Sequence, residues 1–408
     1  MTVIDVVRRP GYRTLLAGQT VSALGDWMGT VAFMEVVWLQ SGSSSAVGGI
    51  LALRLLPAAL GGPLAAKAAG KWDRRKTMVA MDLLRAAMVA IVPLVRGYWW
   101  IYLWAFLLEV AGIVFLPARD ASIPDLVDDD DLPIANGLVL GSSYGTIPIG
   151  AAMFAAVAAL PVADLFDRQY ALVFWIDALT YLVSALFIMR LTQLGRSTST
   201  TATDDQHDVR FRDALALPLV RAVLPATLAV AVGLGALFSL GVRFVRDLLG
   251  ASDAQFGVLI ALFGVGAAFG LVLLQRSNDL DEIKATQAGV AALGIIVAAF
   301  SLAPALWFAY LGAIAFGAGA AWTLSSGMGA LQSNSDGQER VLAFTAFHVV
   351  IRTGLAVAAI GAGLAGDIVD DVHWPLVGRL EGTRLVLLCS GLLVLLSSTR
   401  VSLREAER

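Results

Sequence analysis

The chain of 408 residues has little of what metal and catalytic sites need. It contains one cysteine, Cys389, and three histidines, so an internal disulfide and a cysteine-cluster metal site are excluded. Charged residues make up only 15% of the chain, whereas soluble proteins carry about 25%. The net charge of −3 provides no basic surface of the kind that nucleic acids require. We therefore expect no metal, no cofactor and no nucleic-acid partner.

Recognisable catalytic motifs are also lacking. No nucleophile, base and orienting acid stand at a known spacing, and no Walker loop is found. The sequence thus predicts a protein that is not an enzyme and does not use ATP. An ion gradient, with protons as the expected ion, is the remaining source of energy.

Apolar residues are abundant, at 58% of the chain with a mean hydropathy of +0.76. A membrane-crossing helix needs roughly 20 such residues, so the chain has room for about twelve spans with short loops. We therefore predict an all-α polytopic membrane protein of twelve transmembrane helices in two six-helix halves. The expected spans lie near residues 14–40, 44–66, 77–96, 99–117, 134–163, 169–190, 217–240, 254–275, 285–303, 305–330, 341–369 and 383–399.

The distribution of basic residues predicts the orientation. Lys67, Lys71, Arg74, Arg75 and Lys76 crowd the segment between spans 2 and 3, which is cytoplasmic if the N-terminus is inside. An even number of spans then leaves both termini in the cytoplasm. We expect a multi-pass protein of the cell membrane.

A polar segment rich in Ser, Thr and Asp, residues 193–213, interrupts the apolar pattern. It divides the chain into an N-terminal half at 1–192, a cytoplasmic linker at 193–215 and a C-terminal half at 216–408. Two six-span halves around a midplane cavity are typical of secondary transporters.

Ionisable residues inside spans are candidates for function, because a charge at mid-bilayer costs about 2.5–3.5 kcal/mol. Asp26 in span 1 and Glu109 in span 4 lie near the middle of their spans and are candidate proton carriers. Alternatively, Asp26 pairs permanently with Arg54 of span 2, and Glu109 makes a structural hydrogen bond. Glu35 is expected near the outer end, within reach of water.

Two clusters of charged residues are expected to have structural rather than transport roles. Asp82 and Arg85, one turn apart in span 3, are expected to form a structural charge cluster with Arg74 and Arg75. The run of residues 128–131 consists of four aspartates and is expected to be solvated, since it lacks the spacing of a calcium loop.

In span 11, His348 and Arg352 are four residues apart and therefore lie on one helical face. That face could bind an anionic group or exchange a proton, or it could lock span 11 against span 2. In span 5, Gly145 and Gly150 with Pro148 belong to a glycine-rich run that favours close approach of a neighbouring helix.

Four segments carry a resemblance to a known family. Residues 62–86 (GPLAAKAAGKWDRRKTMVAMDLLRA), 117–137 (PARDASIPDLVDDDDLPIANG), 174–185 (FWIDALTYLVSA, which includes Asp177) and 336–341 (DGQERV) resemble signatures of the major facilitator superfamily. The branch they resemble contains macrolide and other multidrug exporters.

The resemblance implies a twelve-span fold, alternating access and export in exchange for protons. It also implies that spans 1, 4, 7 and 10 line the cavity, which favours Asp26 and Glu109, and that spans 2 and 11 meet. Gly70 stands where the family usually has an Asp that helps to latch the halves, and Asp73 is placed to substitute for it.

The leading hypothesis is a monomeric, proton-coupled exporter of a small amphipathic organic compound. Trp27, Trp307 and Trp322 are the candidate substrate contacts, and the small molecule and the lipid bilayer are the expected partners. Two alternatives stay open: export of a lipid-like or siderophore substrate, and a facilitator fold that has lost transport and acts as a sensor or membrane partner.

Overall fold

A computed structural model describes residues 3–60, 72–95, 97–128, 131–160, 170–192, 194, 217–276, 281–333, 337–369, 372–374 and 378–400. The basic run from Gly62 to Lys71 and nearly all of the expected linker lie outside these residues. Residue contacts divide the chain into two compact units. Unit 1 comprises Met1–Val36 and Leu60–Asp205, and unit 2 comprises Val37–Ala59 and Gln206–Arg408. The second expected span thus groups with the C-terminal helices by its contacts.

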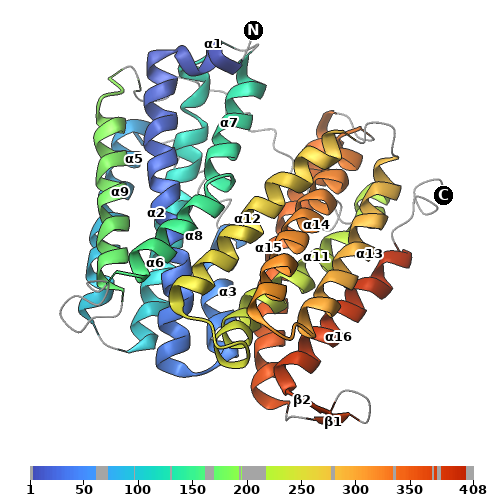
Figure 1. Cartoon of the computed structure of the whole chain (residues 1–408). Coiled ribbons are helices and arrows are strands. Elements are labelled where there is room, and N and C mark those ends of the chain that lie inside the picture. Colours follow the sequence, from blue (N-terminus) through green and yellow to red (C-terminus); the bar gives the residue numbers. More distant parts are fainter. Residues whose placement is uncertain are drawn as a thin grey trace. The chain divides into compact units, whose positions relative to one another are not determined.

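The described part of the chain is built almost entirely of helices (Figure 1). Unit 1 contains α1 (Val3–Arg8), most of α2 (Pro10–Ser41), α5 (Arg74–Ile91), α6 (Tyr98–Asp120), α7 (Leu132–Tyr144), α8 (Ile147–Ala158) and α9 (Ala171–Met189), with 3₁₀ turns η1 (Val92–Leu94) and η2 (Ile123–Asp125). Unit 2 contains the last turn of α2, α3 (Ser44–Leu60), α11 (Pro218–Arg243), the π-helical turn η5 (Phe244–Leu248), α12 (Asp253–Gln275), α13 (Glu282–Ser301), α14 (Leu306–Ser333), α15 (Gly337–Ile368), α16 (Gly382–Ser397) and the 3₁₀ turn η6 (Ser398–Arg400).

A short hairpin is the β-structure that the described residues show. Strands β1 (Val372–Trp374) and β2 (Gly378–Leu380) pair antiparallel, with Val372 opposite Leu380. It connects α15 to α16 and leaves the predicted all-α class unchanged.

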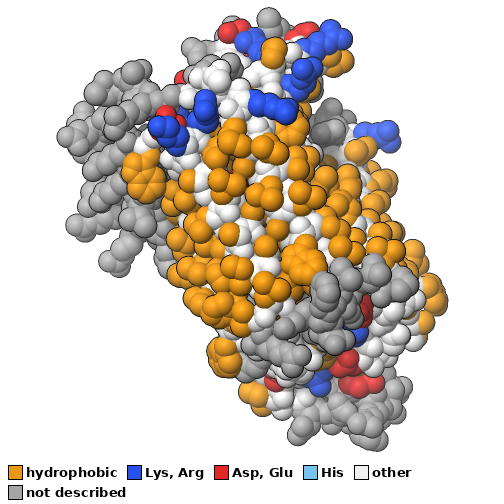
Figure 2. All heavy atoms as spheres, turned by 90° about the vertical axis from the view of Figure 1, so that its left-hand side faces the viewer, with side chains coloured by type: hydrophobic (Ala, Val, Ile, Leu, Met, Phe, Trp, Pro, Cys, Tyr) orange, Lys and Arg blue, Asp and Glu red, His pale blue; other side chains and the backbone are white. Residues whose placement is uncertain are grey.

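Among the described residues, eight helices are long and apolar enough to cross a membrane. Their outer surfaces are apolar as well. Leu83 and Leu84 of α5 and Leu179, Leu182 and Leu186 of α9 are exposed. Figure 2 shows a largely hydrophobic face, with Lys and Arg side chains near its upper end. Exposure of so much apolar surface to water is unfavourable, so the face is suited to contact with lipid tails.

The helix ends carry local signals that the sequence encodes. Ser252 and Gln255 form a reciprocal capping box at the start of α12, and Asp281 accepts hydrogen bonds from the backbone N–H groups of Ile283 and Lys284 at the start of α13. Each cap satisfies backbone donors that the first helical turn leaves unpaired.

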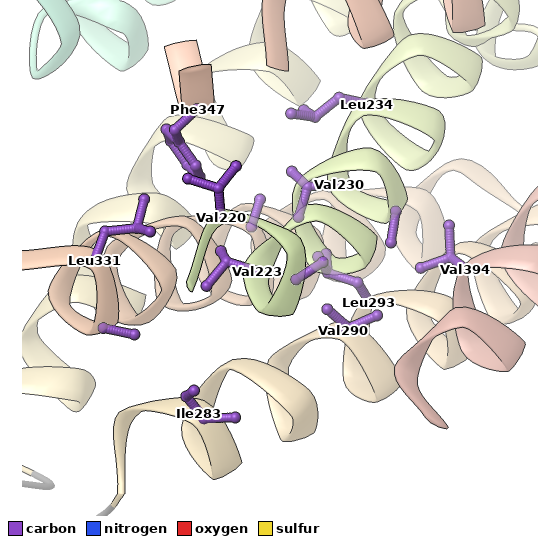
Figure 3. Close-up of a cluster of buried hydrophobic side chains, with 14 of the residues drawn as sticks. Val220, Val223, Val230, Leu234, Ile283, Val290, Leu293, Leu331, Phe347 and Val394 are labelled. Carbon is purple, nitrogen blue, oxygen red and sulfur yellow. The ribbon is translucent and has the colours of Figure 1, made fainter. Parts of the chain in front are cut away.

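Each unit has its own apolar core. In unit 2, Val220, Val223 and Val230 of α11 pack with Val290 and Leu293 of α13 and with side chains from α14, α15 and α16 (Figure 3). In unit 1, a second core surrounds buried Tyr12, Met78 and Phe115, and it takes side chains from α1, α2, α5, α6 and α7.

Helix α1 is held to the start of α7 by an ion pair. Arg9 Nη2, one residue beyond α1, lies 2.5 Å from Asp128 Oδ2 and 2.6 Å from Asp131 Oδ2. The hydrogen bond and the charge of Arg9 hold the pKa of Asp128 below its usual value. The expectation of a fully solvated aspartate run is wrong for Asp131, which is 2% exposed, because Arg9 and the end of α1 cover it.

Candidate functional site

A chain of four polar side chains crosses the interior of unit 1. The hydroxyl of Tyr181 on α9 donates a hydrogen bond to Oδ1 of Asp26 on α2. The guanidinium of Arg85 on α5 lies 4.6 Å from the centre of the Tyr181 ring and 4.3 Å from that of Phe115 on α6. Arg85 Nη2 in turn donates to Asp82 Oδ1 at 2.5 Å. We call Asp26, Tyr181, Arg85 and Asp82 the buried charge cluster.

Burial differs along the buried charge cluster. Asp82 is 0% exposed, Tyr181 2% and Arg85 8%, whereas Asp26 is only half-buried. Asp26 is therefore the most exposed member of the cluster. The other three side chains lie in a low-dielectric interior, where charges interact strongly.

Two glycines on α2 bring a third carboxylate close to the cluster. A Cβ at Gly25 would lie 2.4 Å from Asp177 Oδ1 and 2.1 Å from Thr180 Oγ1, and one at Gly29 would lie 2.5 Å from Asp177 Oδ2. These glycines are one helical turn apart and form a strip without side chains, against which Asp177 and Thr180 of α9 pack. The spacing places α9 so that Tyr181, four residues after Asp177, reaches Asp26.

The structure corrects the charge cluster expected in span 3. Arg74 does not join Asp82 and Arg85; its Nη1 donates at 2.6 Å to Asp125 Oδ2 and to the carbonyl of Ala121. The reason is position along the helix. Arg74 is the first residue of α5, and Asp82 lies eight residues later, about 12 Å at 1.5 Å per residue.

The neighbouring candidates for gating lie at the start of α5. Asp73 caps the helix, accepting a hydrogen bond from the backbone N–H of Lys76 at 2.8 Å. Arg75 is half-buried. Whether Asp73 replaces the family's latching carboxylate stays a prediction, because Gly70 lies outside the described residues.

The two intramembrane glutamates are placed differently from each other. Glu35 is 0% exposed, so the expectation that water reaches it is wrong. Every residue from Val31 to Trp38 is buried, because this part of α2 is surrounded by protein on all sides. Glu109 on α6 is half-buried, and its role as a proton carrier stays a prediction.

The span expected at residues 134–163 is not one continuous helix. It ends as α7 at Tyr144 and begins again as α8 at Ile147. Pro148, in the first turn of α8, has no N–H to donate to the preceding turn. Beyond the break, Gly150 packs against α2, where an added Cβ would lie 2.7 Å from Trp27 Cβ. Gly145 ends α7 and donates from its N–H to the carbonyl of Gly141 at 2.7 Å.

Of the three tryptophans expected to contact substrate, two form hydrogen bonds between helices. Trp27 Nε1 donates to the carbonyl of Ser143 at 2.7 Å, and Trp322 Nε1 donates to that of Ala285 at 2.9 Å. Trp307 is 61% exposed and packs its ring against Phe308. Contact with substrate stays a prediction for all three.

In unit 2, the start of α3 is docked onto the end of α15 by one carboxylate. Asp367 accepts hydrogen bonds from Ser43 Oγ at 2.7 Å and from the backbone N–H groups of Ser44 and Ser45, both at 2.9 Å. Ser239 Oγ of α11 donates to the Ser44 carbonyl at 2.8 Å. We call this arrangement the Asp367 cap, because a negative charge stabilises the positive end of a helix dipole.

Glycines allow α3, α11 and α15 to approach one another. A Cβ at Gly48 would lie 2.3 Å from the Ala359 carbonyl oxygen, and one at Gly363 would lie 2.6 Å from the Ser44 carbonyl oxygen. Since Ser44 faces Asp367 and Gly48 faces Ala359, α3 and α15 run antiparallel.

The same register places Arg54 of α3 level with Arg352 of α15. Both side chains are half-buried. His348 lies in α15, and its side chain is outside what the structure describes. The functions expected for these three residues stay predictions.

A polar pocket of about 500 Å³ opens beside the Asp367 cap. Trp38, Gly42, Ser43, Arg243, Asp247 and Asp367 line it. Arg243 donates to the Gly366 carbonyl at 2.7 Å, so the cation is used to hold α11 to α15. Within the described ranges, no group of three or more His, Cys, Asp or Glu side chains is arranged to hold a metal ion.

Sequence reasoning missed two of the residues that organise these sites, Tyr181 and Asp367. Tyr181 follows Asp177 by four residues, so helical spacing could have placed it on the same face. No local signal points from Asp367 to the start of α3, because the two are 323 residues apart.

Comparison with known proteins identifies the family. Residues 15–359 match the Major Facilitator Superfamily. The chain belongs to this superfamily. It is therefore an integral membrane protein of a family of transporters, as the sequence signatures predict.

Two bacterial relatives illustrate the range of similarity. The uncharacterized MFS-type transporter YfiS of Bacillus subtilis is 22% identical over 298 residues, which cover 70% of this chain and 68% of YfiS. Macrolide efflux protein A of Streptococcus pyogenes is 27% identical over 154 residues, which cover 36% of this chain and 38% of that protein.

Solved structures confirm the fold. A bacterial homologue of the human lysosomal transporter Spinster aligns with a TM-score of 0.74 at 15% identity, covering 97% of this chain and 96% of that one. The nucleoside transporter NupG aligns with a TM-score of 0.76 at 10% identity, covering 95% and 97%. The facilitator fold of twelve transmembrane helices is thus the fold of this chain.

Proposed function

We propose that this facilitator exports a small amphipathic organic compound in exchange for protons, and that Asp26 carries the exchanged proton. The observation that supports the proposal is the setting of Asp26. It is a half-buried carboxylate in the middle of a long apolar helix, and its hydrogen-bond donor is the neutral hydroxyl of Tyr181. A carboxylate inside a membrane span that is held by a neutral donor and is only partly buried is suited to binding and releasing a proton.

The other parts of the proposal follow from the family and the relatives. Macrolide efflux protein A supports export and an amphipathic substrate. Glu109 on α6 is the second proposed proton carrier, and Trp27, Trp307 and Trp322 are proposed substrate contacts. In this proposal the protein acts as a monomer in the cell membrane, with both termini in the cytoplasm. It needs no cofactor, because the proton gradient supplies the energy.

The test uses inside-out membrane vesicles that contain the protein, energised to a defined pH gradient and loaded with a pH-sensitive dye. A panel of probes that includes a macrolide and a lipophilic organic cation is added. We expect at least one probe to release protons and to accumulate in the vesicles with the original protein, and both signals to disappear with Asp26→Asn. The amide still accepts the Tyr181 hydrogen bond, so the packing of α2 against α9 is kept while the titratable group is removed.

Asp120→Asn is the matched control. Asp120 lies at the end of α6, pairs with Arg119 at 2.8 Å and has a side chain that is 57% exposed, so we expect coupling to be unchanged in this variant. Proton release that persists at the original rate in Asp26→Asn would remove Asp26 from the mechanism.

A further inference from the structure

The surroundings of Asp26 contain more acidic groups than basic ones. The carboxylates of Asp26 and Asp82 interact with each other there, and Arg85 is the cation that interacts with both of them among the described residues of the cluster. A buried charge that lacks a compensating opposite charge is unfavourable. A proton bound to one carboxylate reduces this excess.

Arg85 acts on two of these carboxylates at once. It donates to Asp82 Oδ1, and its guanidinium stacks on the ring of Tyr181, whose hydroxyl donates to Asp26. The charge of Arg85 interacts with both Asp82 and Asp26, and the two carboxylates repel each other. Groups that interact in this way bind protons as a set rather than independently.

We propose that Asp26 and Asp82 form one proton-binding unit, joined by Tyr181 and Arg85, that holds a single exchangeable proton. Asp82 then belongs to the coupling site as a positioning residue that acts on Asp26 through Arg85. This inference rests on the proposed function for its role in transport, although the binding of the proton can be measured without transport.

The chemistry is a simple acid–base exchange. One carboxylate and one proton give one carboxylic acid, on either aspartate. When Asp26 holds the proton, Arg85 neutralises Asp82. When Asp26 is ionised, the single positive charge of Arg85 compensates only part of the negative charge of two carboxylates. The remaining negative charge favours binding of a proton.

The geometry also assigns a route. Asp82 is 0% exposed, so it has no direct contact with water, whereas half-buried Asp26 does. The hydroxyl of Ser184 on α9 also lies near the Asp82 carboxylate, so Asp82 is surrounded by protein groups. Protons therefore enter at Asp26, and Asp82 determines how tightly they are held there.

The experiment measures proton binding directly. Purified protein in lipid nanodiscs, without substrate, is titrated while the carbonyl band of buried carboxylic acids is followed by infrared difference spectroscopy. The buried charge cluster is expected to contribute one titrating acid, and Asp26→Asn is expected to remove or relocate the band of that acid. Asp120→Asn, which alters an exposed carboxylate outside the cluster, should leave the titration unchanged.

Two further substitutions should shift the titration in opposite directions. In Asp82→Asn, the charge of Arg85 stabilises the ionised form of Asp26 alone. The midpoint of the titration should therefore fall by roughly 1–3 pH units, the usual effect of a nearby opposite charge on a carboxyl group. In Arg85→Gln, the compensating charge is lost, so the midpoint should rise by a similar amount or a second proton should bind. Arg85→Lys should restore the midpoint most of the way.

The outcomes separate this inference from the proposed function. An unchanged midpoint in both Asp82→Asn and Arg85→Gln overturns the single unit, even if Asp26→Asn abolishes proton coupling in vesicles. Unchanged coupling in Asp26→Asn overturns the proposed function, whatever the infrared titration shows. If Asp82→Asn fails to fold, the comparison of Arg85→Gln with Arg85→Lys decides: a shift in the first that the second reverses supports the unit, and equal midpoints overturn it.

Discussion

The Asp367 cap makes a quantitative prediction about how firmly α3 is held. Replacing Asp367 by Ala removes three hydrogen bonds to a carboxylate, two of them from the first backbone N–H groups at the start of α3. A hydrogen bond to a charged group contributes about 1.5–3 kcal/mol when buried. Loss of a helix cap costs about 0.5–2 kcal/mol.

The side chain of Asp367 is 23% exposed, and water takes over part of the lost hydrogen bonding. We therefore expect a net loss of about 1–2 kcal/mol from the docked state of this helix end, which corresponds to roughly a 5- to 30-fold increase in its opening.

Thiol labelling can measure this opening. Cys389 is exposed, so it is first replaced by Ser, and Ala46→Cys then places a reporter in the first turn of α3 at a half-buried position. The alkylation rate with a membrane-impermeant maleimide should rise about 5- to 30-fold in Asp367→Ala, in proportion to the predicted opening.

Ser43→Ala is the partial variant. It keeps both backbone contacts to Asp367 and removes the hydrogen bond from Ser43 Oγ to Asp367, together with the one that Ser43 Oγ accepts from the backbone N–H of Ala46. Its effect should be smaller than that of Asp367→Ala. An equal labelling rate with and without Asp367, in protein of unchanged elution profile, would refute the argument that this carboxylate holds α3.

Two more predictions concern packing and pH. Gly48→Ala should destabilise the docking of α3 by about 1–3 kcal/mol, the usual cost of an overpacked contact, because the new methyl group would lie 2.3 Å from the Ala359 carbonyl oxygen. The measurement is the melting temperature in detergent, which should fall. Gly361→Ala is the control and should leave the melting temperature nearly unchanged, because nothing lies within 4 Å of a Cβ at Gly361. The pairing of Arg9 with Asp128 lowers the pKa of Asp128 from 3.8, so its contribution to holding α1 is present above pH 3.8 and is lost as the pH falls through the lowered value. A spin label at Ile4→Cys, in the protein lacking Cys389, should therefore stay immobilised from neutral pH to below 3.8 and become mobile only under stronger acid. A rise in the mobility of the label between pH 6 and pH 5 would contradict this assignment. In Arg9→Gln the same label should be mobile at every pH.

The sequence by itself determined the class, the family and most of the helices of this protein. Long apolar stretches can satisfy their backbone groups in a bilayer only as helices, so hydropathy was sufficient to place them. The rarity of charges inside those helices directed attention to Asp26 and Glu109, because a charged group is costly there. The signatures around Asp177 and between spans 2 and 3 identified the superfamily without any coordinates.

Tertiary structure decided which of the intramembrane charges interact. Asp82 and Arg74 are near neighbours in sequence but bond to different partners, and Tyr181 reaches Asp26 from a helix 155 residues away. Glu35 is enclosed although its position in the chain suggested access to water. These outcomes depend on which helix faces meet, and that is set by packing surfaces such as the Gly25 and Gly29 strip rather than by the local sequence around each charge.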